Sequence, residues 1–191
     1  MIAVRSVEHG EQLLSAGQLP CPACGTPLRR HGHGRPRVLR GIGAARVRVR
    51  PRRAACPVCS RKHVLLPAEL LARRADTTEV IGTALAAKAR GDGARRIAAR
   101  LGRPVSTVRR WLQAADGAHA DWLYQRGVGA AASVERDLLI RPAHQPTRLG
   151  AALNLLAGAA LAYRSRLGLP DPPWALIGIL AGGRLLPVLR T

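Results

Sequence analysis

Apolar residues recur at helical spacing in a short stretch near the middle of the 191-residue chain. Ile97, Ala98 and Leu101 fall on one side of a first short helix, while arginines fall on the other. Gly102 follows where the chain must turn sharply, and Pro104 supplies the fixed φ that is favoured at a helix start. The pattern predicts two short amphipathic helices joined by a tight turn.

The second of these helices has an apolar stripe and a polar face. Val108, Trp111 and Ala115 recur at helical spacing, with Leu112 beside them. The side chains between these positions must therefore face away from the core, which makes them available to a binding partner.

The stretch from Ala94 to Gln113 resembles the helix-turn-helix of regulators, recombinases and transposases. The resemblance rests on the apolar positions, on the small Ala98 that lets two helices approach, and on Gly102 in the turn. It implies that the polar face of the second helix contacts DNA. Arg103 departs from the pattern, which usually has an apolar residue after the turn glycine. The alternative is an ordinary helical hairpin whose arginines are solvated.

Arg110 is expected near the centre of this polar face. There its guanidinium can donate two hydrogen bonds to O6 and N7 of a guanine, and Ser106 can reach an adjacent base or phosphate. Loss of such a bidentate contact costs about 1 to 3 kcal/mol, and only on the matching base pair. The DNA contacts expected from the two helices are Ser106, Thr107, Arg109, Arg110, Gln113 and Arg95.

A longer helix is predicted from Asp76 to about Arg90. Asp76 and Glu79 have the spacing of the N-cap and N3 residues of a capping box. The helix would pack across the two shorter ones and complete a three-helix DNA-binding core. Its apolar face consists of Val80, Ile81, Ala84 and Leu85.

The four cysteines occur as two C-x-x-C pairs, Cys21 with Cys24 and Cys56 with Cys59. Each pair can present two thiolates to one ion, and two pairs complete the tetrahedral shell of a closed structural zinc site. We therefore expect one structural Zn²⁺ per chain, with no open position for catalysis. The alternatives are redox pairs and unligated buried thiols, but the strand–helix–strand context of a thioredoxin-like motif is not visible.

The segment between the two pairs has the alternation and β-branching of strands at Val38–Leu39 and Arg46–Arg50. We expect these strands to form the sheet of a zinc ribbon, with arginines on its other face. Nearby His31, His33 and His63 are interpreted as phosphate contacts or surface residues. The alternative is that one of them replaces a cysteine ligand.

The chain is strongly basic, with a formal net charge of +20 from 31 Lys and Arg against 11 Asp and Glu. No acidic residue occurs from Gln12 to Ala68, where twelve cations accumulate. A solvated basic face is one explanation. However, so many cations on a small module repel one another without counterions, which favours a nucleic-acid phosphate partner. The phosphate contacts expected here are Arg46, Arg48, Arg50 and Arg52.

A longer resemblance covers residues 20–113. A CPxCG pair, a segment with His31, Gly32 and Arg35, a V-x-V strand, a second C-x-x-C pair, an LLP and then the helix-turn-helix occur in this order. The order resembles the N-terminal DNA-binding half of many insertion-sequence transposases. It is also similar to actinobacterial helix-turn-helix proteins of unassigned function.

The chain after the helix-turn-helix loses its basic density. Ala118–Arg126 is predicted to be a helix that buries Trp122 and Leu123, and Gly127–Ser133 is predicted to be flexible.

Two further predicted helices, at residues 149–169 and Trp174–Ala181, are apolar on almost every side. They must be covered either by the rest of the chain or by a second subunit. We expect them to form a homodimer, because a two-fold dimer doubles the DNA site. The richest apolar stripe is Leu149, Leu153, Leu156, Ala160 and Tyr163.

Catalysis is not expected. Transposases of the resembling kind cut DNA with three carboxylates that hold two divalent metals on an RNase H-like sheet. After the helix-turn-helix this chain is too short and too poor in strands for that sheet. No Ser/His/Asp order, phosphate-binding glycine loop or histidine metal pair takes its place. The acidic residues available there are Asp116, Asp121, Glu135, Asp137 and Asp171.

The predicted fold class is mainly α with a small β zinc ribbon. The predicted parts are an N-terminal arm at 1–19, a Cys₄ zinc ribbon at 20–68, a helix-turn-helix domain at 76–126 and a helical C-terminal segment at 147–190. The N-terminus has no long apolar run, and no stretch reaches the roughly 20 residues of a membrane span. We therefore expect a cytoplasmic protein without a membrane partner.

Two functions are compatible with these features. The first is a sequence-specific double-stranded DNA-binding protein, either a transcriptional regulator or a transposase-derived end-binding protein without a catalytic domain. The alternative is an adaptor whose ribbon and apolar C-terminus bind a separate transposase, RNA polymerase or RNA.

Overall fold

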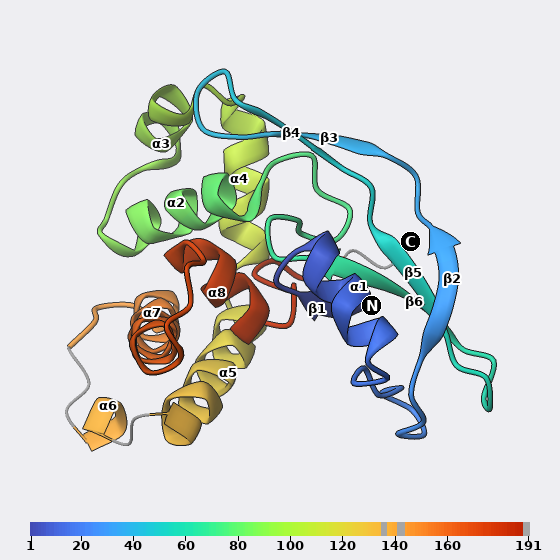
Figure 1. Cartoon of the computed structure of the whole chain (residues 1–191). Helices are drawn as coiled ribbons and strands as arrows, with labels where there is room; N and C mark the ends of the chain where they lie inside the picture. Colours follow the sequence, from blue (N-terminus) through green and yellow to red (C-terminus); the bar gives the residue numbers. More distant parts are fainter. Residues whose placement is uncertain (135–136, 141–143, 189–191) are drawn as a thin grey trace.

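The computed structural model describes residues 1–134, 137–140 and 144–188 (Figure 1). Its strands are β1 (Ile2–Val4), β2 (Arg29–His33), β3 (Arg37–Arg40), β4 (Arg46–Val49), β5 (Arg52–Ala55) and β6 (Lys62–Pro67). Its helices are α1 (Val7–Ser15), α2 (Thr78–Ala89), α3 (Ala94–Leu101), α4 (Val105–Ala114), α5 (Ala118–Val134), α6 (Asp137–Ile140), α7 (Arg148–Leu167) and α8 (Pro173–Leu180).

The N-terminal arm belongs to the main sheet. This sheet has the order β1-β6-β5-β2, in which β1 is parallel to β6 and the other neighbours are antiparallel. The arm consists of β1 and α1. Leu14 of α1 packs with Leu65 of β6 in a small apolar cluster that also contains Cys21 and Cys56. The arm and the ribbon therefore share one core.

The strands predicted between the cysteine pairs form, but in a separate hairpin. β3 pairs with β4 in a two-stranded sheet, whereas the main sheet uses β2, β5 and β6, which the sequence pattern did not indicate. Leu39 and Val49 of the hairpin pack against Leu70, while Arg46 and Arg48 remain exposed. One apolar face is enough to attach the hairpin, so its other face stays arginine-rich as expected.

The helices predicted after the ribbon are confirmed, with one correction at the start of α2. The N-cap is Thr77, whose Oγ1 accepts a hydrogen bond from the backbone N–H of Val80 at 3.4 Å. Asp76 was the expected cap, but its carboxylate is buried and lies between two guanidiniums. An ion pair with each of two arginines stabilises this buried charge more than one backbone N–H can.

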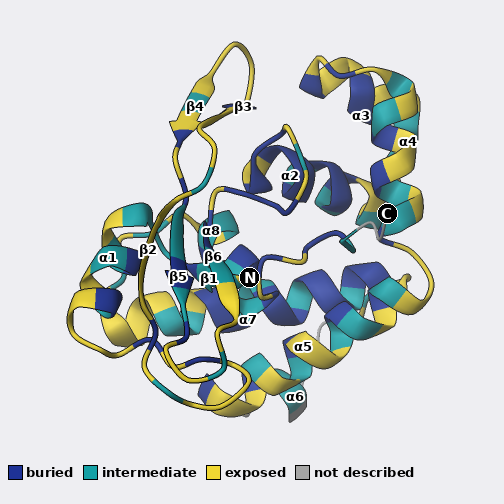
Figure 2. Ribbon diagram, turned by 90° about the vertical axis from the view of Figure 1, so that its right-hand side faces the viewer, coloured by how far each residue is buried: buried dark blue, intermediate teal, exposed yellow. Residues whose placement is uncertain are grey.

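α3 and α4 are joined by a tight turn at Gly102. This residue adopts the left-handed conformation (φ 60°, ψ 43°), which glycine reaches without the steric cost of a side chain. Ile97 and Leu101 are buried on α3, and Val108 and Trp111 are buried on α4, as the spacing predicted. Both helices pack on α2, in which seven of twelve residues are buried (Figure 2).

The segment Gly127–Ser133 is helical rather than flexible, because α5 continues to Val134. At Gly127 a Cβ would lie 2.9 Å from the Cβ of Leu155 and 3.3 Å from the carbonyl oxygen of Ala152, so α5 and α7 approach closely there. Glycine at this position permits close helix packing and does not interrupt the helix.

The apolar C-terminal helices are covered by the same chain. Leu153 and Leu156 of α7 are buried in the core that contains α2 and α5, and Trp174 of α8 lies against Gly82 of α2. This is the alternative to coverage by a second subunit, and it buries Leu149, Leu153, Leu156 and Ala160 of the apolar stripe within the same chain. Within the described residues, no helix is long and apolar enough to cross a membrane.

Candidate metal centre and nucleic-acid interface

Two tight turns position the four cysteines. In the first, Cys21 donates its N–H to the carbonyl of Thr26 at 2.8 Å, and Gly25 donates to the carbonyl of Cys21 at 2.9 Å. In the second, between β5 and β6, Cys56 donates its N–H to the carbonyl of Arg61 at 2.9 Å. The N–H of Cys59 points at the sulfur of Cys56, at 3.4 Å. Each turn therefore presents both of its sulfurs to the same point.

The sulfurs of Cys21, Cys24, Cys56 and Cys59 lie within 4.8 Å of one another, and all four thiols are free of disulfides. The closest pairs join the two turns, with Cys24 3.4 Å from Cys56 and Cys21 3.6 Å from Cys59. Such a set of thiols can hold one metal ion in a four-ligand shell.

The cysteine thiols differ in pKa. Hydrogen bonds from the side chain and the backbone of Thr26 lower the pKa of Cys24 to about 6. The backbone N–H of Arg61 lowers the pKa of Cys59, but burial and the three neighbouring thiols outweigh it and raise that pKa to about 11. Four crowded sulfurs cannot all become thiolates without a cation among them, so the donor set fits a metal ion.

The three histidines have different surroundings. The Nε2 of His63 lies 3.7 Å from the sulfur of Cys21, so this ring borders the cysteine cluster. His31 and His33 lie on β2 and are exposed, and His33 contacts the guanidinium of Arg52. His63 therefore contacts one of the four cysteines, and among the described residues the cysteines alone form the closely grouped set of possible metal ligands.

The expected base-reading residues are accessible. Ser106, Arg109, Arg110 and Gln113 are exposed on α4, Thr107 is half-buried, and Arg95 is exposed on α3. Arg110 lies beside Thr107 of the same helix. Its Nη2 is 3.5 Å from the hydroxyl of Thr107, and both residues line a groove beside α4.

The expected phosphate contacts fall into two groups. Arg46, Arg48 and Arg50 are exposed on or next to the β3–β4 hairpin, and Arg46 also donates hydrogen bonds to carbonyls of the hairpin turn. Arg52 is different, because its side chain is largely buried and pairs with Glu11 of α1. The structure therefore brings three of these four arginines to the outer surface of the ribbon and uses the fourth to attach α1.

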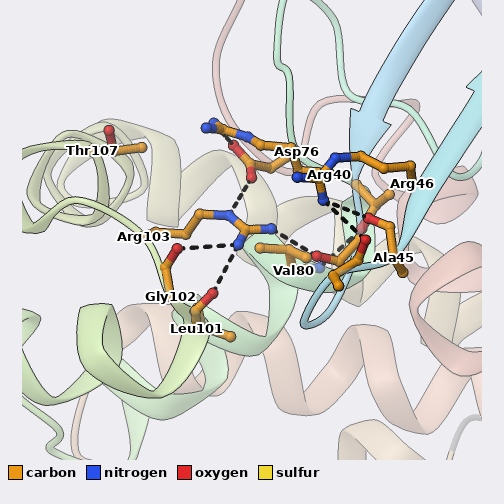
Figure 3. Close-up of polar contacts among 12 residues, drawn as sticks. Arg40, Ala45, Arg46, Asp76, Val80, Leu101, Gly102, Arg103 and Thr107 are labelled. Atoms are coloured by element: carbon orange, nitrogen blue, oxygen red, sulfur yellow. Dashed lines mark hydrogen bonds and ion pairs between the residues drawn. The ribbon is translucent and has the colours of Figure 1, made fainter.

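Arg103 joins the ribbon to the turn between α3 and α4 (Figure 3). Its Nε pairs with Asp76 at 2.6 Å, and its Nη2 donates to the carbonyl of Gly41 in the hairpin at 2.7 Å. Its Nη1 donates to the carbonyl of Leu101 at 2.9 Å. The second oxygen of Asp76 pairs with Arg40 of β3 at 2.6 Å. We call these three residues, Arg40, Asp76 and Arg103, the interdomain ion cluster.

The interdomain ion cluster was not predicted from the sequence. The available signal was the charged Arg103 at a position where helix-turn-helix proteins usually have an apolar residue. The cluster is reinforced by β3, whose Arg40 donates its N–H to the carbonyl of Ala75 and accepts from the N–H of Thr77. It therefore fixes the hairpin and its exposed arginines relative to α4.

One family model matches the chain, described as "Domain of unknown function (DUF6431)", over residues 21–111. The match begins at the first cysteine of the metal centre and ends within α4. It thus includes both cysteine pairs and all three residues of the interdomain ion cluster. No curated protein and no solved structure gives a significant match.

Proposed function

We propose that this protein is a sequence-specific double-stranded DNA-binding protein, either a transcriptional regulator or a transposase-derived end-binding protein without a catalytic domain. The observation that carries the proposal is the pair α3 and α4, which are joined at left-handed Gly102 and expose polar side chains of α4. This arrangement resembles a helix-turn-helix, and the net charge of +20 favours a polyanionic partner.

The two parts would contribute differently to binding. Ser106, Arg109 and Gln113 are exposed on α4 and would reach base edges in a major groove, where each base pair presents a distinct hydrogen-bonding pattern. Arg48 and Arg50 on the ribbon would contact phosphates, which supply affinity without sequence preference. Because the interdomain ion cluster joins the two parts, their contacts would add on one duplex.

We further propose that the four cysteines bind one structural Zn²⁺. Thiolate sulfur suits zinc, and a shell completed by four protein ligands leaves no position for a catalytic water. The role of the ion would be to hold the two cysteine turns together and, through β5 and β6, the main sheet.

An enzymatic role receives no support from the carboxylates after α4. Asp121 pairs with Arg148 and Asp171 pairs with Arg5, while Asp116 accepts a hydrogen bond from the N–H of Gly117. Glu135 lies outside the described residues. Among the described residues, the four cysteines are the only group of three or more ligands that could hold a metal ion.

The decisive experiment selects bound sequences from a random duplex pool with the full, metal-loaded protein. The selected duplex and a scrambled duplex are then titrated by fluorescence anisotropy. Arg109→Ala should weaken binding to the selected duplex by about 1 to 3 kcal/mol and leave the scrambled duplex unchanged.

A second variant tests the ribbon on the same two duplexes. Arg48→Ala should weaken both alike and lower the salt slope by about 0.9. Arg164→Ala, exposed at the end of α7, is the matched control and should change neither. Equal affinity of the wild type for the two duplexes would contradict sequence-specific binding.

One observation favours the alternative function, an adaptor that binds another protein. Val38 and Ile42 of the hairpin region and Val58 of the second cysteine turn are large exposed apolar side chains on the ribbon, at 57%, 44% and 70% exposure. Exposed apolar residues can mark a protein-binding surface. In that case Val38→Ser with Ile42→Ser would abolish binding to a protein partner without changing the affinity for either duplex.

A further inference from the structure

A groove of about 520 Å³ runs between α4 and the segment that leads into α2. One wall is formed by α4 and the other by residues 73–76, with β3 at one end. Four of its lining residues are arginines, and two more are polar residues of α4. The residues that matter here are Arg40, Arg73, Arg74, Thr107, Arg110 and Gln113.

The groove has an excess of positive charge. Asp76 is the single acid among its lining residues, and both of its oxygens are already paired, with Arg40 and with Arg103. Arg74 donates to the carbonyl of Pro187 at 3.2 Å, which is an uncharged partner. The guanidinium of Arg110 is near the hydroxyl of Thr107. The charges of Arg74 and Arg110 are thus not balanced by Asp76.

Arg74 and Arg110 also act on each other. Burial lowers the pKa of Arg74, and the nearby charge of Arg110 lowers it further. Two guanidiniums that face one space repel each other unless an anion lies between them. A phosphate oxygen meets the geometry of both, because planar guanidiniums bind phosphate through paired N–H donors.

We propose that this groove binds a phosphate of the DNA backbone, with Arg74 and Arg110 as its ligands and the hydroxyl of Thr107 as a third donor. The inference rests on the proposed DNA-binding function. It assigns a phosphate contact to Arg110, in place of the guanine contact expected from its position in the sequence. A helix that lies in the major groove is flanked by phosphates, and residues beside it position the helix without reading bases. Base reading is then left to Ser106 and Arg109, which do not line the groove, and to Gln113, which lines it and is exposed on α4.

The test uses the full metal-loaded protein on the selected and scrambled duplexes, titrated at several salt concentrations. Arg110→Ala should weaken both duplexes by the same factor and lower the salt slope by about 0.9, because one phosphate contact is lost. Arg110→Lys should keep the slope, since lysine still neutralises a phosphate. A lysine in place of a bidentate guanine ligand would instead lose sequence discrimination.

Arg109→Ala and Arg164→Ala are the matched controls for a base contact and for a remote surface charge. Arg74→Ala should reproduce the effect of Arg110→Ala, and a thermal melt followed by circular dichroism shows whether loss of its bond to Pro187 has altered the fold. If Arg74→Ala alters the fold, the Arg110 variants still test the proposal, because Arg110 is exposed on α4.

Two results would overturn the inference. The first is an Arg110→Ala variant that loses affinity for the selected duplex alone, which would return Arg110 to base reading. The second is a stabilising effect of inorganic phosphate on the wild type that is absent in Arg110→Ala, together with a failure of phosphate to compete with duplex for binding. That result would make the occupant of the groove a free phosphate. A wild type that binds neither duplex would instead refute the proposed function itself.

Discussion

The ribbon, predicted at residues 20–68, and the helical unit, which comprises α2 to α8, are stabilised in different ways. The ribbon and the arm beside it share a small apolar cluster. Two of its buried members, Cys21 and Cys56, are candidate metal ligands. The helical unit instead buries a continuous core in which α2, α5, α7 and α8 all take part. The ribbon's core is small enough that the proposed metal cross-link would add much of its stability, whereas the helical unit has a large apolar core of its own.

The two parts also differ in how their surface arginines are paired with acidic residues. In the helical unit some exposed arginines have acidic partners, and Asp92 pairs with both Arg96 and Arg100. The ribbon has no acid of its own, and Glu11 of α1 pairs with Arg30 and Arg52 of its sheet. Most of the ribbon's remaining cations face solvent. The helical unit therefore pairs part of its surface charge internally, whereas most of the ribbon's cations are exposed without an acid on the ribbon itself.

Removal of the metal should have the largest effect, and it should unfold the ribbon while the helical core stays folded. Binding of a structural zinc ion contributes about 10–16 kcal/mol to the folding of small zinc domains, so a strong chelator or Cys24→Ser should unfold residues 20–66. Because β1 pairs with β6, the N-terminal arm should loosen as well. Circular dichroism and hydrogen exchange should show that the helical core persists.

The control is Val58→Ser, an exposed position of the same cysteine turn. It should retain one zinc per chain by metal analysis and the wild-type exchange pattern. A wild-type protein that is fully folded with well under one zinc per chain would contradict both the metal assignment and the contrast between the two parts.

Leu156→Asp should break the helical unit. Leu156 is fully buried on α7, and an unpaired buried charge costs more than about 5 kcal/mol, which is the lower end of the stability of a typical domain. Thermal unfolding and solubility measure this loss. The ribbon should keep its metal in the surviving soluble protein, as read by metal analysis.

Leu161→Asp is the matched control on the same helix, because Leu161 is 55% exposed. It should leave the fold intact, and sedimentation then tests the homodimer predicted from the sequence. A dimer that uses the exposed face of α7 would dissociate in this variant. A soluble, folded Leu156→Asp monomer would show instead that α7 is covered by a second subunit.

Asp76→Asn should have a smaller effect, which is confined to the connection between the two parts. Removal of one partner from a buried ion pair costs about 3–5 kcal/mol, because the charge of Arg103 is left without compensation. The free energy of unfolding should fall by this amount in urea titrations. Hydrogen exchange should rise at the hairpin and at the turn between α3 and α4.

Asp92→Asn provides the comparison, since Asp92 pairs with Arg96 and Arg100 at the surface of α3. It should change the free energy of unfolding far less, because solvent screens these charges. Equal losses in the two variants would mean that the interdomain ion cluster contributes no more than a surface pair.

Features that depend on short spacing were predictable from the sequence. The C-x-x-C pairs implied a four-sulfur cluster, and the apolar spacing around Gly102 implied α3, the turn and α4, because these patterns are set by a few neighbouring residues. Strands β2, β5 and β6 were missed. β2 and β5 consist mostly of arginine, histidine and alanine, and β6 has the sequence KHVLLP, which does not alternate between apolar and polar residues. They become strands through pairing with one another.

The errors share the same origin. Asp76 has the local features of a helix cap, but its partner Arg103 is 27 residues away and the contact of Arg103 with Gly41 spans 62 residues. Gly127 has the local features of a flexible segment, but α7 packs against it. In each case a distant segment supplies the stabilising contact, and local propensity cannot report it.

The sequence by itself determined the cysteine cluster, the helix–turn–helix succession at Gly102 and the basic charge, since composition and short-range geometry are fixed by the order of residues. Only the tertiary structure decided that the C-terminal helices cover the core of their own chain, that Arg103 links the ribbon to α4, and that Arg110 shares a groove with Arg74. These arrangements depend on which distant surfaces meet, and that is settled by the burial of apolar area and the pairing of buried charge over the whole chain.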